Sequence, residues 1–310
     1  MRLLIALSGK SDAFMLRTLF GLFALGLTVV LLVTSGSLFV LWVWFELNAF
    51  FFATHLAVTG VSSSAVGYFV AQSIGSVLVL SALFFGYSPA LLVCALLLKI
   101  GLPPAHFWVL NLLKFIDWRA LSVLLTLQKV APLLLVVFVR GARLGLVLVL
   151  SASMVCGLAF GFAASSAFVL LLFSSFVHSL FVLVALAFSL RLFMVYVLAY
   201  FPPLVLCLAF LNNALFYSCV AAALFGFLVL AVVRLTGFPP FSVFFGKWGV
   251  VMLAHGSPFM VGILLLSLGA LFFYFRVCLV CFCLSEVPQL FAPLSLVCPL
   301  CLRSGPRCLF

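Results

Sequence analysis

Long apolar runs, broken by short polar or charged stretches, occupy most of the chain. Each run is apolar on every face, and about 20 such residues cross a bilayer as a helix. Backbone groups cannot stay unpaired in hydrocarbon, so a helix is the spanning element that this pattern predicts. We predict about eleven spanning helices, at residues 13–34, 37–58, 66–86, 89–110, 121–139, 144–162, 167–188, 192–211, 214–234, 241–254 and 259–284.

The predicted fold class is therefore an all-α polytopic membrane protein. We expect residues 13–284 to form a single transmembrane helical domain, residues 1–12 an N-terminal tail and residues 285–310 a C-terminal tail. The first twelve residues include Arg2 and Lys10 but precede no convincing cleavage site, so we expect no cleavable signal.

The amino-acid composition excludes several other classes of protein. Hydrophobic residues make up 68% of the chain and charged residues 6%, against roughly 25% charged in a soluble domain. This leaves too few polar side chains to cover a soluble enzyme. The net charge of +11 is not gathered into a basic run, which argues against a nucleic-acid partner. The abundance of Phe, Val, Leu, Cys and Gly over Lys, Asn and Gln is typical of a strand-skewed organelle genome.

Four of the ten cysteines follow a zinc-like C-x2-C spacing, at Cys278, Cys281, Cys298 and Cys301. The first pair lies within a predicted span, and prolines surround the second pair. We therefore interpret the pattern as compositional and predict no metal site, with a metal or a disulfide as the alternative.

Five ionisable residues lie inside predicted spans, namely Glu46, Lys99, Lys129, His178 and Lys247. A charge at mid-bilayer costs at least about 2.5–3.5 kcal/mol, so such residues usually have a function. Each also has a simpler explanation: a lysine near a span end can reach the interface, a histidine can be hydrogen-bonded in the core, and Glu46 can form one structural ion pair. One pair would not explain three lysines. We interpret His55, His255, Asp117 and Arg119, which lie near predicted span ends or in loops, as surface groups.

Two similar Gly/Pro motifs lie beside buried lysines and predict two broken helices. One consists of Gly101, Pro103 and Pro104, directly after Lys99; the other consists of Gly237, Pro239 and Pro240, shortly before Lys247. A third interruption is predicted at Pro132, three residues after Lys129. Proline in a span frees a backbone carbonyl, which protein or water must then satisfy. Paired interruptions of this kind indicate a site at mid-membrane, and a simple kink is the alternative for each.

Proton transfer is the chemistry that suits this set of residues. Hydrocarbon surroundings favour a neutral lysine, whereas a nearby carboxylate favours the charged form, so changes at Glu46 could make a lysine release or capture a proton. His178 could relay protons between lysines. The sequence contains no phosphate-binding glycine loop, no convincing haem-binding histidine pair and no catalytic triad, so we predict that this chain has no redox site.

Several segments resemble the subunit 2 family of mitochondrial NADH–ubiquinone oxidoreductase (respiratory complex I), one of its antiporter-like membrane subunits. The motifs that carry the resemblance are WFELN at 44–48, YFVAQS at 68–73, KIGLPPAHFW at 99–108, LTLQKVAP at 125–132, SSFVH at 174–178, GFPP at 237–240 and FGKW at 245–248.

The resemblance implies an antiporter-like bundle in the mitochondrial inner membrane. Glu46 and Lys99 would couple this subunit to its neighbour, Lys129 and His178 would lie on a central hydrophilic axis, and Lys247 would lie at its distal end. The partners implied are the other membrane-arm subunits and inner-membrane lipid. The resemblance also implies that this chain binds no cofactor, and that NADH, flavin, iron–sulfur clusters and ubiquinone bind to other subunits.

Three alternatives stay open at this point. The chain could be another antiporter-like subunit or a stand-alone cation/proton antiporter, which share Glu- and Lys-bearing helices. It could be a secondary transporter for a small solute, or a structural scaffold whose buried charges are merely paired. The glutamate motif at 44–48 and the lysine motif at 125–132 favour subunit 2.

Overall fold

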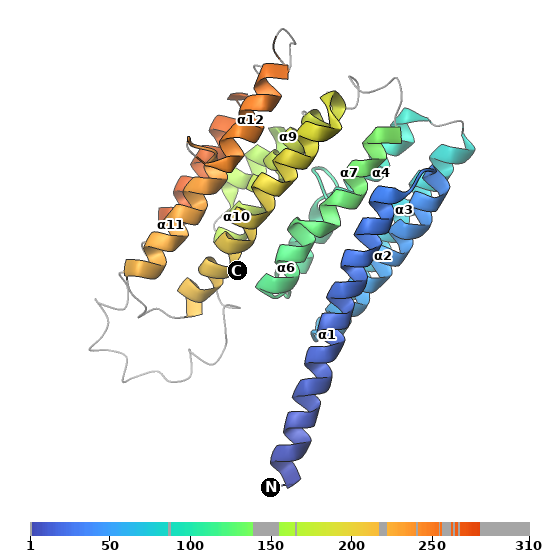
Figure 1. Ribbon diagram of the computed structural model, residues 1–310, viewed down its shortest axis with the longest axis vertical. Coiled ribbons are helices and arrows are strands. Elements are labelled where there is room, and N and C mark those ends of the chain that lie inside the picture. Colours follow the sequence, from blue (N-terminus) through green and yellow to red (C-terminus); the bar gives the residue numbers. More distant parts are fainter. Residues whose placement is uncertain are drawn as a thin grey trace. The chain divides into compact units, whose positions relative to one another are not determined.

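The computed structural model describes residues 2–85, 88–138, 155–164, 166–216, 222–239, 241–253, 255, 262, 264–265 and 267–279. Every regular element in these residues is an α-helix, which confirms the predicted all-α class (Figure 1). The chain divides into two compact units, Met1–Val149 and Leu150–Phe310. The single domain expected over residues 13–284 stays a prediction.

The first unit is a bundle of antiparallel helices and shorter half-helices. α1 to α4 pack in chain order, α5 packs on α3, and α7 lies against α1, α2 and α4. The helices are α1 (Arg2–Thr34), α2 (Leu38–Val58), α3 (Ser62–Phe84), α4 (Pro89–Ile100), α5 (Phe107–Leu113), α6 (Trp118–Leu125) and α7 (Leu127–Phe138). α1 begins at Arg2, so the stretch expected to form an N-terminal tail is helical from there on.

The second unit contains α9 (Ala167–Phe188), α10 (Leu190–Phe216), α11 (Ala222–Thr236) and α12 (Ser242–Leu253). Residues 155–163 and 267–279 are also helical. α9 contacts α10 and α12, and α10 contacts α11 and α12. In the most apolar stretch of α9, 94% of the residues are buried, against 44% in that of α10. α9 therefore lies in the interior of this unit. Its bounds are those predicted from the sequence.

Four helices in the described residues are long and apolar enough to cross a membrane, at Phe39–Val58, Ser62–Ala82, Ala167–Leu186 and Leu190–Asn212. Five shorter apolar helices lie at Thr18–Thr34, Ala90–Ile100, Gly226–Thr236, Ser242–Leu253 and Ser267–Leu279. The total of eleven spans therefore stays a prediction. Large apolar side chains such as Phe23, Phe84 and Leu198 are exposed on these helices, as expected of a surface that faces lipid.

The first predicted interruption ends α4. Gly101 adopts a left-handed conformation, with φ of 74°, and its N–H and that of Leu102 donate to Leu98 O (3.2 Å) and Leu97 O (2.9 Å). These two hydrogen bonds form a Schellman motif. Trp108 Nε1 donates to Leu98 O at 3.1 Å, so an indole satisfies a carbonyl at the helix end. Lys99 lies in the last turn of α4, and the chain re-enters a helix at Phe107.

Replacing Gly101 by alanine is expected to lower the stability of the assembled protein by about 1–2 kcal/mol or more, because an L-residue is strained in the left-handed region. The new Cβ would also overlap Val109 Cγ2 and lie 3.0 Å from Trp108 Cζ2. The measurement is the thermal unfolding midpoint of the purified assembly. Gly26→Ala is the matched control, because a Cβ at Gly26 meets nothing within 4 Å. Equal midpoints for both variants would show that Gly101 is not required for this turn.

Candidate functional site

The five predicted site residues lie on five helices, three of them in the first unit and two in the second. Glu46 is in α2, Lys99 in the last turn of α4 and Lys129 in α7; His178 is in α9 and Lys247 in α12. Lys99, Lys129 and His178 are buried, whereas Glu46 and Lys247 are half-buried. The structure thus places these groups inside the two bundles instead of on their exposed faces.

Two consecutive residues of α3 position Glu46 and Lys99. Gly75 has no side chain, and a Cβ there would lie 2.8 Å from Lys99 Cγ and 3.5 Å from Lys99 Cε. The aliphatic part of Lys99 therefore passes directly over the α3 backbone. The next residue, Ser76, donates a hydrogen bond from its hydroxyl to Glu46 Oε1. A single turn of α3 thus accommodates the lysine and binds the carboxylate.

The Ser76 hydroxyl contacts two acceptors at once. Its Oγ lies within hydrogen-bond distance of Glu46 Oε1 and also 2.8 Å from Ser73 O. A serine hydroxyl has one proton to donate. The hydroxyl therefore shares this proton between Glu46 Oε1 and Ser73 O, or donates it to one of them at a time. Ser76 thus links the Glu46 carboxylate of α2 to the backbone of α3.

Lys99 is 4% exposed and is surrounded by α2 and α3. Its Nζ lies 4.7 Å from the centroid of the Phe45 ring, and its carbonyl accepts a hydrogen bond from Gln72 Nε2 at 3.1 Å. The Glu46 carboxylate interacts electrostatically with the ammonium group. No direct ion pair joins Glu46 and Lys99, which are both within the described part of the chain. The pair is therefore coupled across a gap, with an aromatic face against the lysine.

Lys129 is 5% exposed and lies in the first turn of a half-helix. α6 ends at Leu125 and α7 begins at Leu127, so the interruption lies at Thr126, whose hydroxyl donates to Ser122 O at 2.6 Å. The break predicted at Pro132 is wrong, because α7 continues through this residue to Phe138. Proline has no N–H for the carbonyl four residues earlier, so it costs α7 one hydrogen bond without ending it.

His178 lies in the buried helix α9 and has tyrosine hydroxyls on both ring nitrogens. Nδ1 is 2.8 Å from Tyr196 Oη and Nε2 is 2.7 Å from Tyr274 Oη. The Tyr200 ring stacks on the imidazole, with centroids 4.2 Å apart. The histidine therefore belongs to a polar cluster in the interior of the second unit.

Lys247 lies at the second predicted interruption. α11 ends at Thr236, Gly237 has φ of 78°, and α12 begins at Ser242. Lys247 Nζ donates to Thr236 O at 2.7 Å, which places a cation at a helix C-terminus, where it is favoured. The lysine also lines a cavity of about 250 Å³ together with Phe181 and Trp248. Pro239 lies between the two helices, and Pro240 lies outside the described residues.

Sequence reasoning missed several residues of these sites. Pro202 and Pro203 lie inside α10, where the Ser242 hydroxyl donates to Ala199 O at 3.4 Å. Ala199 O is the carbonyl that Pro203 leaves without its helical donor. This proline pair was visible in the sequence. The tyrosines around His178 and the small residues at 75–76 leave no periodic signal.

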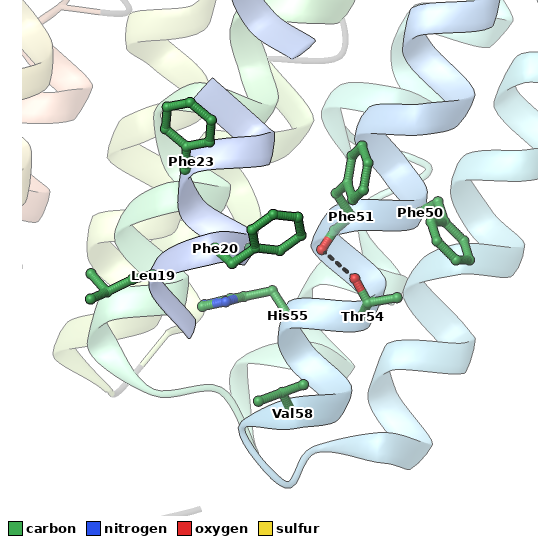
Figure 2. A pocket seen from close by; sticks show the side chains of 9 residues that line it. Leu19, Phe20, Phe23, Phe50, Phe51, Thr54, His55 and Val58 are labelled. Carbon is green, nitrogen blue, oxygen red and sulfur yellow. Dashed lines mark hydrogen bonds between the residues drawn. The ribbon is translucent and has the colours of Figure 1, made fainter. Parts of the chain in front are cut away.

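His55 is buried, so its assignment as a surface group is wrong. It is 6% exposed, because it packs against α1 at Gly21, where a Cβ would lie 3.3 Å from His55 Nδ1. Among the described residues nothing hydrogen-bonds to this nitrogen. Figure 2 shows the imidazole in an apolar pocket of about 780 Å³ between α1 and α2, beside Phe20 and Val58. Asp117, Arg119 and His255 are exposed, as predicted.

The cysteine pattern falls mostly outside the described residues. Cys278 is a free thiol, and Cys281, Cys298 and Cys301 are not described. Within the described ranges no three His, Cys, Asp or Glu side chains gather as metal ligands do. The chemistry available at the described sites is that of a carboxylate, three amines, an imidazole and phenols, which all exchange protons.

Comparison with known proteins gives relatives over most of the chain, although no family model matches it. Over 257 residues the chain is 32% identical to NADH-ubiquinone oxidoreductase chain 2 of Mytilus edulis, covering 79% of this chain and 80% of the relative. It is 28% identical over 255 residues to NADH-ubiquinone oxidoreductase chain 2 of Artemia franciscana, covering 80% of this chain and 84% of the relative.

The fold is also similar to a solved structure. A chain of respiratory complex I from Thermus thermophilus, determined with bound Aureothin, matches with a TM-score of 0.73 and 21% identity. The match covers 85% of this chain and 70% of that chain. At this identity the likeness concerns the fold.

Proposed function

Because the chain belongs to the NADH-ubiquinone oxidoreductase chain 2 family, we propose that it is a membrane-arm subunit of complex I that translocates protons. The protons would move along buried Glu, Lys and His side chains, driven by electron transfer from NADH to ubiquinone in other subunits. The chain would then be part of an H⁺-translocating NADH:ubiquinone reductase without having a redox site of its own.

The observation that carries this proposal is the position of three amines and one carboxylate inside the described helices. Lys99 and Lys129 are buried, and Lys247 is half-buried, in a chain with only 6% charged residues. Glu46 interacts with Lys99. Retaining three lysines inside a bilayer is costly, and such residues usually have a function. Amines that change protonation during turnover account for all three.

In the first unit, the geometry supports a switch at Glu46. The carboxylate and Lys99 are held by neighbouring residues of α3, with Ser76 bonded to Glu46 Oε1 and Gly75 under the Lys99 side chain. Protonation removes the negative charge that attracts the Lys99 ammonium. Lys99 would then release its proton more readily. Because α4 packs against α7, the released proton would have a short route toward Lys129.

In the second unit, His178 would receive protons and Lys247 would deliver them to the aqueous side. A cavity of about 250 Å³ beside Lys247 has room for several waters, since one water occupies about 30 Å³ of liquid. At the C-terminal end of α11, Thr236 O accepts a hydrogen bond from Lys247 Nζ and so orients the lysine. We propose that the helices interrupted at Gly101 and Gly237 are the two broken helices of an antiporter-like bundle.

The same family relation suggests the location and the partners. We propose that the chain is a multi-pass protein of the mitochondrial inner membrane, surrounded by lipid and by other membrane-arm subunits of complex I. Flavin, iron–sulfur clusters, NADH and ubiquinone would bind to those other subunits. We propose no nucleic-acid partner and no metal for this chain.

Native-gel separation of detergent-solubilised inner membranes tests the assembly directly. We expect peptides of this chain, detected by mass spectrometry, in a very large band that stains for NADH dehydrogenase activity. A control lane of soluble matrix proteins should lack these peptides. If the peptides instead run in a small band without NADH activity, the proposal fails, and a stand-alone cation/proton antiporter becomes the better explanation.

A further inference from the structure

The feature that goes beyond the family resemblance is the environment of His178. Three of the six tyrosines of the chain surround this one imidazole. Tyr196 and Tyr200 come from α10 and Tyr274 from the helix at 267–279. All three tyrosines are buried, and two of them hydrogen-bond to opposite ring nitrogens. The imidazole is therefore a bridge between two phenol hydroxyls.

Such a bridge restricts where the protons lie. A neutral imidazole has one N–H donor and one bare nitrogen acceptor. One tyrosine must therefore donate to the ring while the other accepts from it. The three groups form a hydrogen-bonded row with a direction, and reversing that direction moves a proton from one end of the row to the other.

Tyr196 extends this row toward Lys247. Its ring lies on the backbone of α12 at Gly246, where a Cβ would be only 2.6 Å from Tyr196 Cδ2. Gly246 directly precedes Lys247 in the sequence. The Tyr196 ring also stacks on Phe181, with centroids 6.0 Å apart and planes at 7°. Phe181 lines the cavity of Lys247, and Lys247 Nζ lies 5.5 Å from its ring centroid.

We propose that Tyr274, His178 and Tyr196 form a proton relay that leads toward Lys247, and that Gly246 gives Tyr196 the space to reach it. This inference rests on the proposed proton translocation and names two residues that the family motifs do not include. A glycine at 246 is required because any side chain there would displace the Tyr196 ring.

One proton passes through the relay in a series of transfers between neighbouring groups. The starting state has the Tyr274 hydroxyl donating to Nε2 and the Nδ1–H donating to the Tyr196 oxygen. An incoming proton binds the Tyr274 oxygen, whose own proton moves to Nε2. The Nδ1 proton moves to the Tyr196 oxygen, and the Tyr196 hydroxyl proton leaves toward Lys247. Each O–H or N–H bond that breaks is matched by one that forms, and the three side chains end neutral.

The test is Tyr196→Phe in the whole complex, reconstituted in liposomes, with protons translocated per NADH oxidised as the readout. The variant keeps the ring that packs on Gly246 and Phe181 and removes only the hydroxyl. We expect a fall in this ratio and a drop in proton flux of about tenfold or more, as for loss of a positioned proton-transfer group. Leu198→Ala in the same helix is the control, because Leu198 is exposed, and it should behave as the parent protein.

A second variant covers the case in which Tyr196→Phe does not assemble. Tyr274→Phe removes the hydroxyl at the other end of the row, and the relay predicts the same loss of protons per NADH. If an assembled Tyr196→Phe or Tyr274→Phe complex pumps like the parent while His178→Ala is impaired, the relay is overturned and proton translocation by the chain stands. If His178→Ala and Lys129→Ala also pump like the parent, the proposed function itself fails.

Discussion

Replacing Lys129 by alanine is expected to lower NADH-driven proton translocation by about 10²-fold or more, because a positioned proton-transfer group contributes about 10²–10⁴-fold. Lys129 is 5% exposed and lies at the start of α7, just after the interruption at Thr126, so no surface role accounts for its charge. Alanine is a strong helix former, so the variant should keep α7 intact. The measurement is the quenching of a pH-sensitive dye in liposomes that hold the complex.

Two further variants separate proton transfer from charge and from general damage. Lys129→Arg keeps a positive charge that is not given up in proteins, so it should also fail to translocate protons. Lys114→Ala removes an exposed lysine between α5 and α6 and should translocate protons like the parent protein. Normal proton flux in Lys129→Arg would contradict a role that requires Lys129 to lose its proton.

Replacing Glu46 by glutamine is expected to reduce proton translocation by about tenfold or more, on the same scale as other proton-transfer groups. Glutamine keeps the size of the side chain and can still accept a hydrogen bond from Ser76, but it has no charge to gain or lose. Lys99 would then lack the carboxylate that interacts with it. The measurement is proton flux at equal amounts of assembled complex.

Ser76→Ala is the matched variant for Glu46. It removes the hydroxyl that binds Glu46 but leaves the carboxylate in place, so we expect a smaller loss of flux than for Glu46→Gln. A hydrogen bond to a charged group contributes about 1.5–3 kcal/mol, so the local effect should be a modest loss of stability. Unchanged flux in Glu46→Gln would mean that the Glu46 charge is structural.

The apolar runs alone predicted most helices, because backbone N–H and C=O groups in hydrocarbon must be hydrogen-bonded within the chain. The bounds of α9 follow from its sequence, and the end of α4 follows from Gly101 and the prolines after it. The break at Thr126 was not predictable, since no glycine or proline marks it. Pro132, by contrast, carries the usual signal of a break but lies inside α7.

The sequence predicted the candidate sites only through their ionisable residues, which are rare in this chain. A charge in an apolar run is conspicuous, so Glu46, Lys99 and Lys129 were evident from the sequence. Gly75 and Ser76 matter through contacts with other helices, which a single sequence does not encode.

His55 and the tyrosines around His178 show the same limit. His55 was placed on the surface because it lies near a span end, whereas contact with Gly21 in another helix buries it. Tyr196 and Tyr274 are far apart in the sequence and meet only because both reach the ring of His178. Partners of this kind require the packing of the helices to be known.

The number of protons translocated per NADH oxidised, measured in liposomes holding the purified complex, tests the central claim most directly. Lys129→Ala and Lys114→Ala are compared with the parent protein at equal rates of NADH oxidation. If this chain conducts protons, the ratio falls in Lys129→Ala and stays at the parent value in Lys114→Ala. If all three ratios are equal, the buried charges are structural and the chain is a scaffold of the membrane arm.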